Sequence, residues 1–313
     1  MSAQHRTTVP GTRGSLARSR PRYGEFVVKA VLLTAAMVSV ATTIGIVIAL
    51  LEPTVEFFAA VSIGEFFGST DWGPLFNPPA FGVWPLIVAT VEITLIAVVV
   101  AVPLGLAAAI YLSEYASHRT RKIFKPVLEV LAGVPTVVFG FFALTFVTPL
   151  FRNLFPFLDL EAKNALAAGL LVGVMIIPIV ASLSEDSMAA VPNGLREGSY
   201  ALGASKMLTS VRVVVPAAFS GIVAAIILAI SRAAGETMIV AIAGGFKSVF
   251  TLYPGNEMST MAAFIAQAGS GDASVGSIAY KTIFAVGSLL FVITFAMNYL
   301  SARMVQKYRE VYD

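Results

Sequence analysis

Six long apolar stretches constrain the fold of this 313-residue sequence more than any other feature. They cover residues 26–51, 84–112, 124–150, 165–183, 217–246 and 278–301. Each has about the 20 residues with which a helix crosses ~30 Å of hydrocarbon. None alternates polar and apolar residues over units of about ten residues, as the strands of a membrane β-barrel do. The pattern predicts an all-α membrane protein with about six transmembrane helices.

The composition agrees with this prediction. Charged residues make up 12% of the chain and hydrophobic residues 57%, with a mean hydropathy of +0.84, whereas soluble domains carry about 25% charged residues. A soluble fold of this length could not bury so much apolar surface, so the main solvent must be lipid. The sequence contains no cysteine, which excludes disulfides, thiolate metal sites and cysteine nucleophiles.

The first stretch, 26–51, has two interpretations. A cleaved signal peptide has an apolar core of roughly 7–15 residues followed by a small-x-small cleavage site. The apolar run in this sequence is longer, and no such site follows it cleanly. We therefore expect the stretch to be retained as the first transmembrane helix.

Lysine and arginine residues indicate the orientation of the chain in the membrane. They gather in the N-terminal tail, in the loops after the second and fourth stretches, and at the C-terminus. The 52–83 loop, on the opposite side, contains four acidic residues and no basic one. Because basic loops stay in the cytoplasm, both termini are predicted to be cytoplasmic. That orientation requires an even number of spans.

Residues 1–23 form a tail rich in Arg, Ser, Thr, Gly and Pro. This composition predicts a disordered basic cytoplasmic tail, and residues 24–313 then form the transmembrane domain. Nucleic-acid binding is one interpretation of the tail, but contact with anionic lipid headgroups is simpler. Nothing else in the sequence suggests nucleic acid.

The cytoplasmic loop 184–216 is the most informative polar segment. At roughly 30 residues it is far longer than a link between neighbouring helices needs to be. Pro-Asn-Gly at 192–194 breaks the chain, residues 195–202 are good helix formers, and Gly203 ends the run. An ordinary solvated loop is the alternative to a short helix that meets a partner. The polar residues that such a helix would expose to the partner are Arg196, Glu197 and Tyr200.

The same loop resembles the EAA motif of ABC importer permeases. That pattern reads Glu-Ala-Ala, three residues, glycine, nine residues, then hydrophobic, any residue, hydrophobic and proline. Here residues 197–199 read Glu-Gly-Ser, Gly203 follows after three residues, and residues 213–216 close the pattern. Glycine and serine replace the two alanines, which keeps a face of small residues. The residues that this resemblance assigns to coupling are Arg196, Glu197, Gly198, Ser199, Gly203 and Pro216.

The resemblance implies a coupling helix that seats in a groove of a separate ATP-binding subunit. Closure of that subunit on ATP would push the helix and rock the attached spans between inward-open and outward-open states. The phosphate-binding motif G-x-x-x-x-G-K-[ST] does not occur, and residues 244–248 resemble it only superficially. The chain is therefore expected to be a transport subunit rather than an enzyme, with ATP and magnesium bound by the partner and no cofactor of its own.

Two ionisable residues inside the fifth stretch are candidates for the substrate pathway. Arg232 and Glu236 lie four residues apart in Ser-Arg-Ala-Ala-Gly-Glu-Thr-Met, so they share a helical face and can pair. Charge inside a membrane is costly and usually functional, and a guanidinium suits the oxygens of an oxyanion. Ser231 and Thr237 add hydroxyl groups nearby. The alternative is a purely structural ion pair, and this chemistry does not separate phosphate from sulfate or molybdate.

Other residues in the apolar stretches carry weaker signals. Structural roles are expected for Glu129 and Lys281, and the role of Glu92 stays open. Gly169 and Gly173 predict a close helix contact. Three prolines are expected to interrupt spans, and the break at 133–136 is the one expected to line the pathway. These prolines are Pro103, Pro135 and Pro178.

From about residue 24 the whole chain resembles the permeases of phosphate-specific (Pst) ABC importers, and their C-type subunit more than their A-type subunit. The segments that carry the resemblance are 81–116, 125–146, 183–206 and 231–238. It implies a type I importer (MetI-like) permease fold in the bacterial inner membrane. In such permeases an arginine and a glutamate of the last segment are implicated in phosphate passage, and they match Arg232 and Glu236.

The resemblance also implies a set of partners. They are a paralogous A-type permease, two copies of an ABC ATPase, and an external phosphate-binding protein received by the loops 52–83 and 247–276. Two rival functions remain: a permease for another oxyanion, and a secondary transporter or channel. A secondary transporter needs no ATPase and normally shows repeat symmetry, which is not visible in this sequence. An intramembrane enzyme would need a metal-ligand cluster or a nucleophile with its base, and no such set occurs in the spans.

Overall fold

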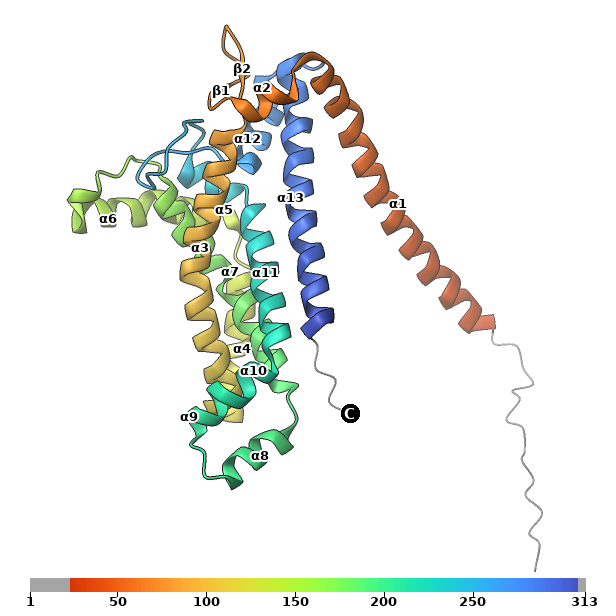
Figure 1. Cartoon of the computed structure of the whole chain (residues 1–313), viewed down its shortest axis with the longest axis vertical. Coiled ribbons are helices and arrows are strands. Elements are labelled where there is room, and N and C mark those ends of the chain that lie inside the picture. Colours follow the sequence, from red (N-terminus) through yellow and green to blue (C-terminus); the bar gives the residue numbers. More distant parts are fainter. Residues whose placement is uncertain (1–22, 309–313) are drawn as a thin grey trace, which may run out of the picture. The chain divides into compact units, whose positions relative to one another are not determined.

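The computed structural model describes residues 23–308, which are predominantly helical (Figure 1). By its internal contacts the chain divides into two units, one ending at Ala49 and one beginning at Leu50. The first unit holds most of helix α1, which runs over Tyr23–Ala60. The predicted tail 1–23 lies outside the described residues except for Tyr23, which already belongs to α1.

Five of the described helical segments are long and apolar enough to cross a membrane. They are Glu25–Ala60, Trp84–Tyr115, Thr136–Leu154, Ala165–Ala189 and Ile278–Lys307. Two more, Lys206–Ala217 and Phe219–Ala234, reach that length only together, and they meet at a bend of 72°. The expected helical membrane protein is confirmed, with five spans, or six if the bent pair forms one.

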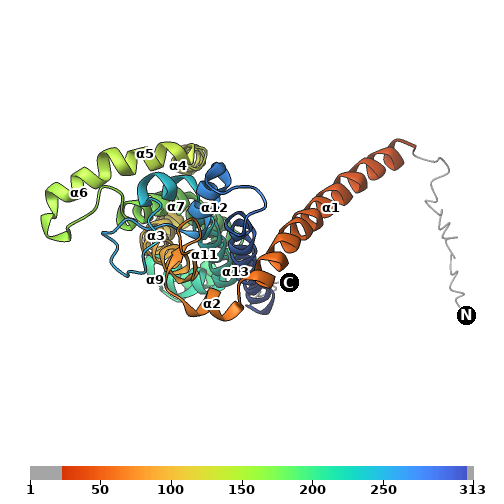
Figure 2. The ribbon, with the colours of Figure 1, turned by 90° about the horizontal axis from the view of Figure 1, so that it is seen from above.

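Four long helices make up the core of the second unit. Figure 2 shows them side by side when the bundle is viewed from above, with α11 in contact with the other three. They are α3 (Trp84–Ile110), α7 (Ala165–Ala189), α11 (Phe219–Ala234) and α13 (Ile278–Tyr308). The most extensive contact joins α3 to α7, and α11 packs on both α7 and α13.

Glycines let α3 and α7 approach closely. A Cβ added to Gly169 would lie 2.7 Å from Ile96, and one added to Gly105 would lie 2.7 Å from Val180. A Cβ on Gly173 would lie 2.9 Å from a carbonyl oxygen of α3. The contact expected from Gly169 and Gly173 is confirmed, and because residue numbers rise together along it, the two helices run parallel.

Two of the three prolines do not interrupt their helices. Pro103 lies inside α3 and Pro178 lies inside α7, and both helices continue past them. The expectation of a break is wrong at these two positions. Proline removes one ladder hydrogen bond, but neighbouring helices can support a helix through that loss in a membrane.

The break predicted at Pro135 is confirmed, so the third stretch is not one continuous helix over 124–150. It begins as α4 (His118–Ala132), an amphipathic helix whose first turns are basic, and α4 ends at Gly133. Pro135 has extended backbone angles, and the apolar span starts only after it. A residue before proline avoids the α conformation, which explains the break. The remaining segments are α5 (Thr136–Phe142), the π-helical turn η2 (Ala143–Val147) and α6 (Thr148–Leu154).

The fifth stretch is also interrupted, so the continuous helix predicted over 217–246 is wrong. Helix α11 begins at Phe219 and ends at Ala234, and the chain leaves the helical path over residues 235–237. Helical structure resumes at Met238 and continues into the π-helical turn η5 (Val240–Gly244). Gly235, a poor helix former, stands at the break.

The predicted cytoplasmic loop 184–216 begins later than expected. Its first six residues continue α7, and Ser184 and Glu185 are buried in the bundle. The short helix predicted from residue 195 to Gly203 is confirmed as α8 (Asn193–Ala201). The segments that return to the bundle are α9 (Lys206–Thr209), the π-helical turn η4 (Ser210–Val214) and α10 (Val215–Ala217).

The opposite end of the second unit carries several short elements and an aromatic cluster. Phe57, Phe66 and Phe81 pack edge to face, and Trp72 packs the same way against Phe264. Edge-to-face contacts of this kind add to the stability from burial alone. The elements are α2 (Ile63–Gly68), β1 (Trp72–Gly73) paired antiparallel with β2 (Ala80–Phe81), η3 (Pro156–Leu158), α12 (Met261–Gln267) and η6 (Ala268–Asp272).

Candidate functional site

The pair predicted inside the fifth stretch forms at the break that follows α11. Arg232 lies in the last turn of that helix, and its Nη1 donates to Oε2 of Glu236 over 3.1 Å. The two side chains differ in exposure: Arg232 is 48% exposed and Glu236 only 3%. The positive group is open to its surroundings, while the negative group is enclosed.

Glu236 is held from both sides. Its Oε1 accepts backbone N–H bonds from Met238 at 3.2 Å and from Ile239 at 3.3 Å. A side-chain oxygen in this position caps the orphan amides at the start of the next helical segment. The carboxylate therefore fixes the break, and Arg232 is anchored through one nitrogen while the rest of its fork is available.

The two predicted hydroxyl residues are placed differently. Ser231 donates to Oδ1 of Asn298 on α13 at 3.0 Å, so it ties α11 to its neighbour. Thr237 donates to the carbonyl of Gly235 at 3.3 Å within the break itself. The structure thus joins Arg232 to Glu236 and turns Ser231 and Thr237 to other partners.

An apolar hollow of about 270 Å³ lies between α3, α11 and α13. Ile230 and Ala234 of α11 line it, as do Thr90 and Thr94 of α3. The two threonine hydroxyls donate to carbonyls of their own helix, and Thr90 also accepts from the backbone of α12. The hydroxyl donors of the hollow are thus already used within α3, so the hollow itself is poorly suited to an anion.

Helix α8 presents a face of small and exposed residues. A Cβ added to Gly198 or Gly203 would meet nothing within 4 Å, and Leu202 is 91% exposed. Gly203 ends the helix with a φ of +83°, a left-handed conformation that favours glycine. Ser199 bonds Thr209 of α9 at 2.8 Å, which holds the loop as a hairpin. Pro216 lies in α10, just before the bend into α11.

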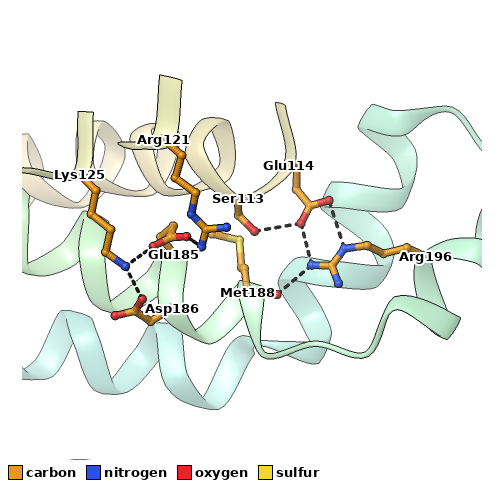
Figure 3. Close-up of polar contacts among 8 residues, drawn as sticks. All are labelled: Ser113, Glu114, Arg121, Lys125, Glu185, Asp186, Met188 and Arg196. Atoms are coloured by element: carbon orange, nitrogen blue, oxygen red, sulfur yellow. Dashed lines mark hydrogen bonds and ion pairs between the residues drawn. The ribbon is translucent and has the colours of Figure 1, made fainter. Parts of the chain in front are cut away.

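The exposure predicted for Arg196 is wrong. Its side chain is only 15% exposed, because the guanidinium turns inward to the carboxylate of Glu114 and the carbonyl of Met188 (Figure 3). It also donates to the carbonyl of Val191, just after α7. Glu197 and Tyr200 are exposed, as predicted. Sequence reasoning missed Glu114, although a carboxylate at the inner end of an apolar stretch was a signal for it.

A second ionic cluster joins α4 to α7 beside this pair (Figure 3). Glu185 is 1% exposed and is paired with Arg121 and with Lys125, the latter at 2.9 Å. Lys125 also contacts Asp186 at 2.7 Å. A buried carboxylate needs such partners because an unpaired charge would be strongly destabilising. The sequence analysis placed these acidic residues in a loop and missed this role.

Three other charged residues of the apolar stretches have distinct surroundings. Lys281 pairs with Glu56 at 2.8 Å, which agrees with the structural role expected of it. Glu129 is exposed on α4. One oxygen of Glu92 is buried without a hydrogen-bond partner among the described residues.

At the opposite end of the bundle, Glu161 ties two connecting segments together. Its carboxylate accepts the backbone N–H of Glu257 at 2.7 Å and the Nζ of Lys247 at 3.2 Å. The hydrogen bond from the amide, followed by the lysine, lowers the pKa of Glu161. Tyr253 also donates to the carbonyl of Leu158, so several hydrogen bonds join the same two segments.

The chain, with its broken apolar helices and projecting hairpin, matches a known family. The profile of the family described as "Binding-protein-dependent transport system inner membrane component" matches residues 101–306. The chain belongs to this family. The match includes α8, the break after α11 and most of α13.

Individual relatives support the assignment to this family, and a solved structure shows the fold. "Probable ABC transporter permease protein YqgH" of Bacillus subtilis (strain 168) is 36% identical over 275 residues, covering 86% of this chain and 88% of the relative. "Phosphate transport system permease protein PstC 1" of Mycobacterium tuberculosis (strain ATCC 25618 / H37Rv) is 32% identical over 290 residues, covering 81% and 85%. A structure of the MetNI methionine ABC transporter in an inward-facing conformation matches with a TM-score of 0.53 at 19% identity, covering 73% and 95%. The last match shows the fold, which is the MetI-like permease fold.

Proposed function

We propose that this chain is the permease subunit of an ATP-driven importer that moves inorganic phosphate into the cytoplasm. One observation carries the proposal: a half-exposed guanidinium is anchored to a buried carboxylate at a break in a membrane helix. Charged groups at such depth mark substrate pathways, and broken helices form binding sites in many transporters. The phosphate transport permease among the relatives favours phosphate over other anions.

The residues of the pair have separate tasks in this proposal. Arg232 donates from the free part of its fork to oxygens of the passing anion, and this replaces part of the water that the anion loses. Glu236 keeps the guanidinium aimed and in place between transport events. The carboxylate itself stays behind the arginine, so the anion does not meet its negative charge.

Coupling to ATP belongs to a partner in this proposal. Helix α8 would seat in a groove of an ABC ATPase, with Glu197 facing the partner and the glycines allowing close backbone approach. Two copies of that ATPase would bind ATP and magnesium. A paralogous A-type permease would complete the pathway, and an external phosphate-binding protein would dock on the loops 52–83 and 247–276. The assembly would lie in the bacterial inner membrane as a multi-pass complex, with no nucleic acid involved.

A permease for another oxyanion is the second candidate, because a guanidinium also binds sulfate and molybdate oxygens. The test is reconstitution of the chain with its ATPase, paralogous permease and binding protein in lipid vesicles. Uptake of phosphate, sulfate and molybdate is then compared with and without ATP. We expect uptake of phosphate alone, and only with ATP.

Two results of that experiment would contradict the proposal. ATP-driven uptake of sulfate or molybdate in place of phosphate would identify the second candidate. Phosphate movement that continues without the ATPase would identify a secondary transporter or channel. Vesicles with ATPase but without this chain serve as the control for leakage.

A further inference from the structure

The π-helical turn at the inner end of α3 contacts both arms of the cytoplasmic hairpin that contains α8. This turn, η1 (Tyr111–Tyr115), continues α3 directly. Its residue Glu114 binds Arg196 of α8. The Nζ of Lys206 of α9 lies over the ring of the next residue, Tyr115, at 5.0 Å from the ring centre. Two neighbouring residues of one turn thus hold the two helices of the hairpin.

The contact between Glu114 and Arg196 has the form of a rigid joint. Nη2 donates to Oε1 at 2.9 Å and Nε to Oε2 at 3.4 Å, so both ends of the fork face both oxygens. Glu114 is 3% exposed, and Ser113 donates to its Oε1 at 3.0 Å. A two-pronged pair between an arginine and a carboxylate fixes direction as well as distance.

The same guanidinium reaches the end of α7. It donates to the carbonyl of Met188 at 2.8 Å and to that of Val191 at 2.6 Å. The two carbonyls lie in the last turn of α7 and just after it, where a positive charge is favourable. Arg196 therefore joins α8 to both central helices of the bundle, directly to α7 and through Glu114 to α3.

We propose that η1 is the seat of the coupling hairpin, and that Glu114 is a positioning residue through which displacement of α8 is passed to α3. The inference rests on the proposed function, in which an ATPase pushes α8. Because Ser199 and Thr209 bond the two arms together, the hairpin moves as one body. A π-helical turn is a frequent feature of functional sites in helices, and here it directs Glu114 at one arm and Tyr115 at the other.

The first test uses Glu114→Gln in the complete reconstituted complex. This variant keeps the size of the side chain and removes its charge, and we expect phosphate transported per ATP hydrolysed to fall about 10-fold while hydrolysis continues. Lys281→Gln removes an ion pair far along the chain and should leave the ratio unchanged. The combined change Glu114→Arg with Arg196→Glu restores a pair of opposite charge and should recover part of the ratio. A merely structural role would lower both rates in proportion and leave the ratio unchanged, which would overturn the proposal.

Glu114→Gln leaves the buried charge of Arg196 without its carboxylate partner, which could impair folding. A second variant therefore tests the seat at an exposed residue. Tyr115 is exposed, so Tyr115→Leu should fold while it loses the cation–π contact with Lys206. We expect the ratio for this variant to fall about 2-fold. An unchanged ratio in well-assembled Tyr115→Leu complexes would remove Tyr115 from the seat.

A distance measurement tests the seat without relying on phosphate. The chain has no native cysteine, so spin labels can be placed at Leu104 of α3 and Leu195 of α8, both exposed. If the seat is rigid, the distance between the labels stays the same with and without ATP in the otherwise native complex. In the Glu114→Gln variant the distribution of distances should broaden. A native complex whose label distance changes on ATP binding would overturn the seat, even if phosphate uptake is normal. A complex with a constant distance that moves no phosphate would refute the proposed function alone.

Discussion

Arg232 and Glu236 share one ion pair but meet their surroundings differently, and this asymmetry decides what the site can bind. The carboxylate is enclosed and uses both oxygens, one for the arginine and one for two backbone amides. The guanidinium is half exposed. A structural pair with both partners enclosed would have no capacity left for a ligand, so the exposed fork favours the pathway role.

Arg232→Gln is expected to lower ATP-driven phosphate uptake about 10- to 100-fold. A hydrogen bond to a charged group contributes about 1.5–3 kcal/mol, and 1.4 kcal/mol corresponds to a factor of ten. Uptake of labelled phosphate by reconstituted vesicles measures the effect. Arg303→Gln, near the end of α13, is the matched control and should behave as the native protein. Native uptake by the Arg232 variant would exclude this residue from the pathway.

Glu161 provides a pH-dependent contact outside the spans. Its pKa lies below its ordinary value of 4.5 because the amide of Glu257 donates to it. A carboxylate with a lowered pKa stabilises the fold fully above the ordinary value and loses that contribution as pH falls through the lowered one. We expect the amide of Glu257 to be protected from hydrogen exchange at neutral pH and to lose protection below about pH 4, after correction for the intrinsic rate.

The variant Glu161→Gln isolates this effect. It cannot titrate, so the protection of the Glu257 amide should be weaker at neutral pH and should change little with acid. Equal acid sensitivity in the native chain and in this variant would show that another group is responsible.

The C-terminal end of helix α8 depends on the backbone conformation of Gly203. Gly203 has a φ of +83° and free space around it, so alanine there meets backbone strain rather than a clash. A left-handed conformation costs an L-residue roughly 1–2 kcal/mol. We expect Gly203→Ala to distort the end of α8 and to lower phosphate uptake per ATP hydrolysed, and a bulkier residue to lower it further by obstructing the docking face.

Gly194 is the matched control for this prediction. It also lies in α8 with nothing within 4 Å of an added Cβ, but its φ is not positive. Gly194→Ala should therefore fold without strain and retain coupling. If both variants couple normally, the assignment of α8 as the coupling helix fails.

The parallel contact of α3 with α7 is sensitive to side-chain volume, whereas the end of α8 is sensitive to backbone conformation. Gly173→Ala would put a Cβ 2.9 Å from a carbonyl oxygen of α3, and overpacking typically costs about 1–3 kcal/mol. We expect thermal unfolding of the detergent-solubilised complex at a lower temperature than for the native protein. Gly198→Ala, which meets nothing within 4 Å, should not lower it. An unchanged unfolding temperature for Gly173→Ala would show that the helices can separate without cost.

The sequence predicted the features that depend on neighbouring residues and missed those that depend on residues far apart in the chain. Pro192 and Gly203 bound α8 because proline and glycine restrict or free their own backbone. The break after α11 was missed, since one glycine and one carboxylate inside an apolar run do not distinguish a bent helix from a straight one. The direction of Arg196 was missed because its partner, Glu114, is 82 residues away in the sequence, and no local pattern contains that contact.

At the scale of the whole molecule, the predicted orientation places α8 and α9 in the cytoplasm and the 245–257 segment outside. The absence of native cysteine makes this simple to test. A cysteine at Phe250 should react with an impermeant maleimide in intact cells, and one at Met207 should react only after permeabilisation. Both side chains are exposed. The reverse pattern would invert the topology and remove the coupling assignment.

If Arg232 lines the pathway as proposed, its exposure in place of Glu236 has a consequence for the energy balance of a cell. An interior-negative membrane potential draws cations inward with about 2.3 kcal/mol per charge at 100 mV. A pathway that displayed the carboxylate would invite such ions and would discharge the gradient on which other transporters depend. With the carboxylate enclosed and the guanidinium open, an entering cation meets repulsion first. In the proposed pathway, the arrangement that suits an anion would therefore also oppose a leak of cations.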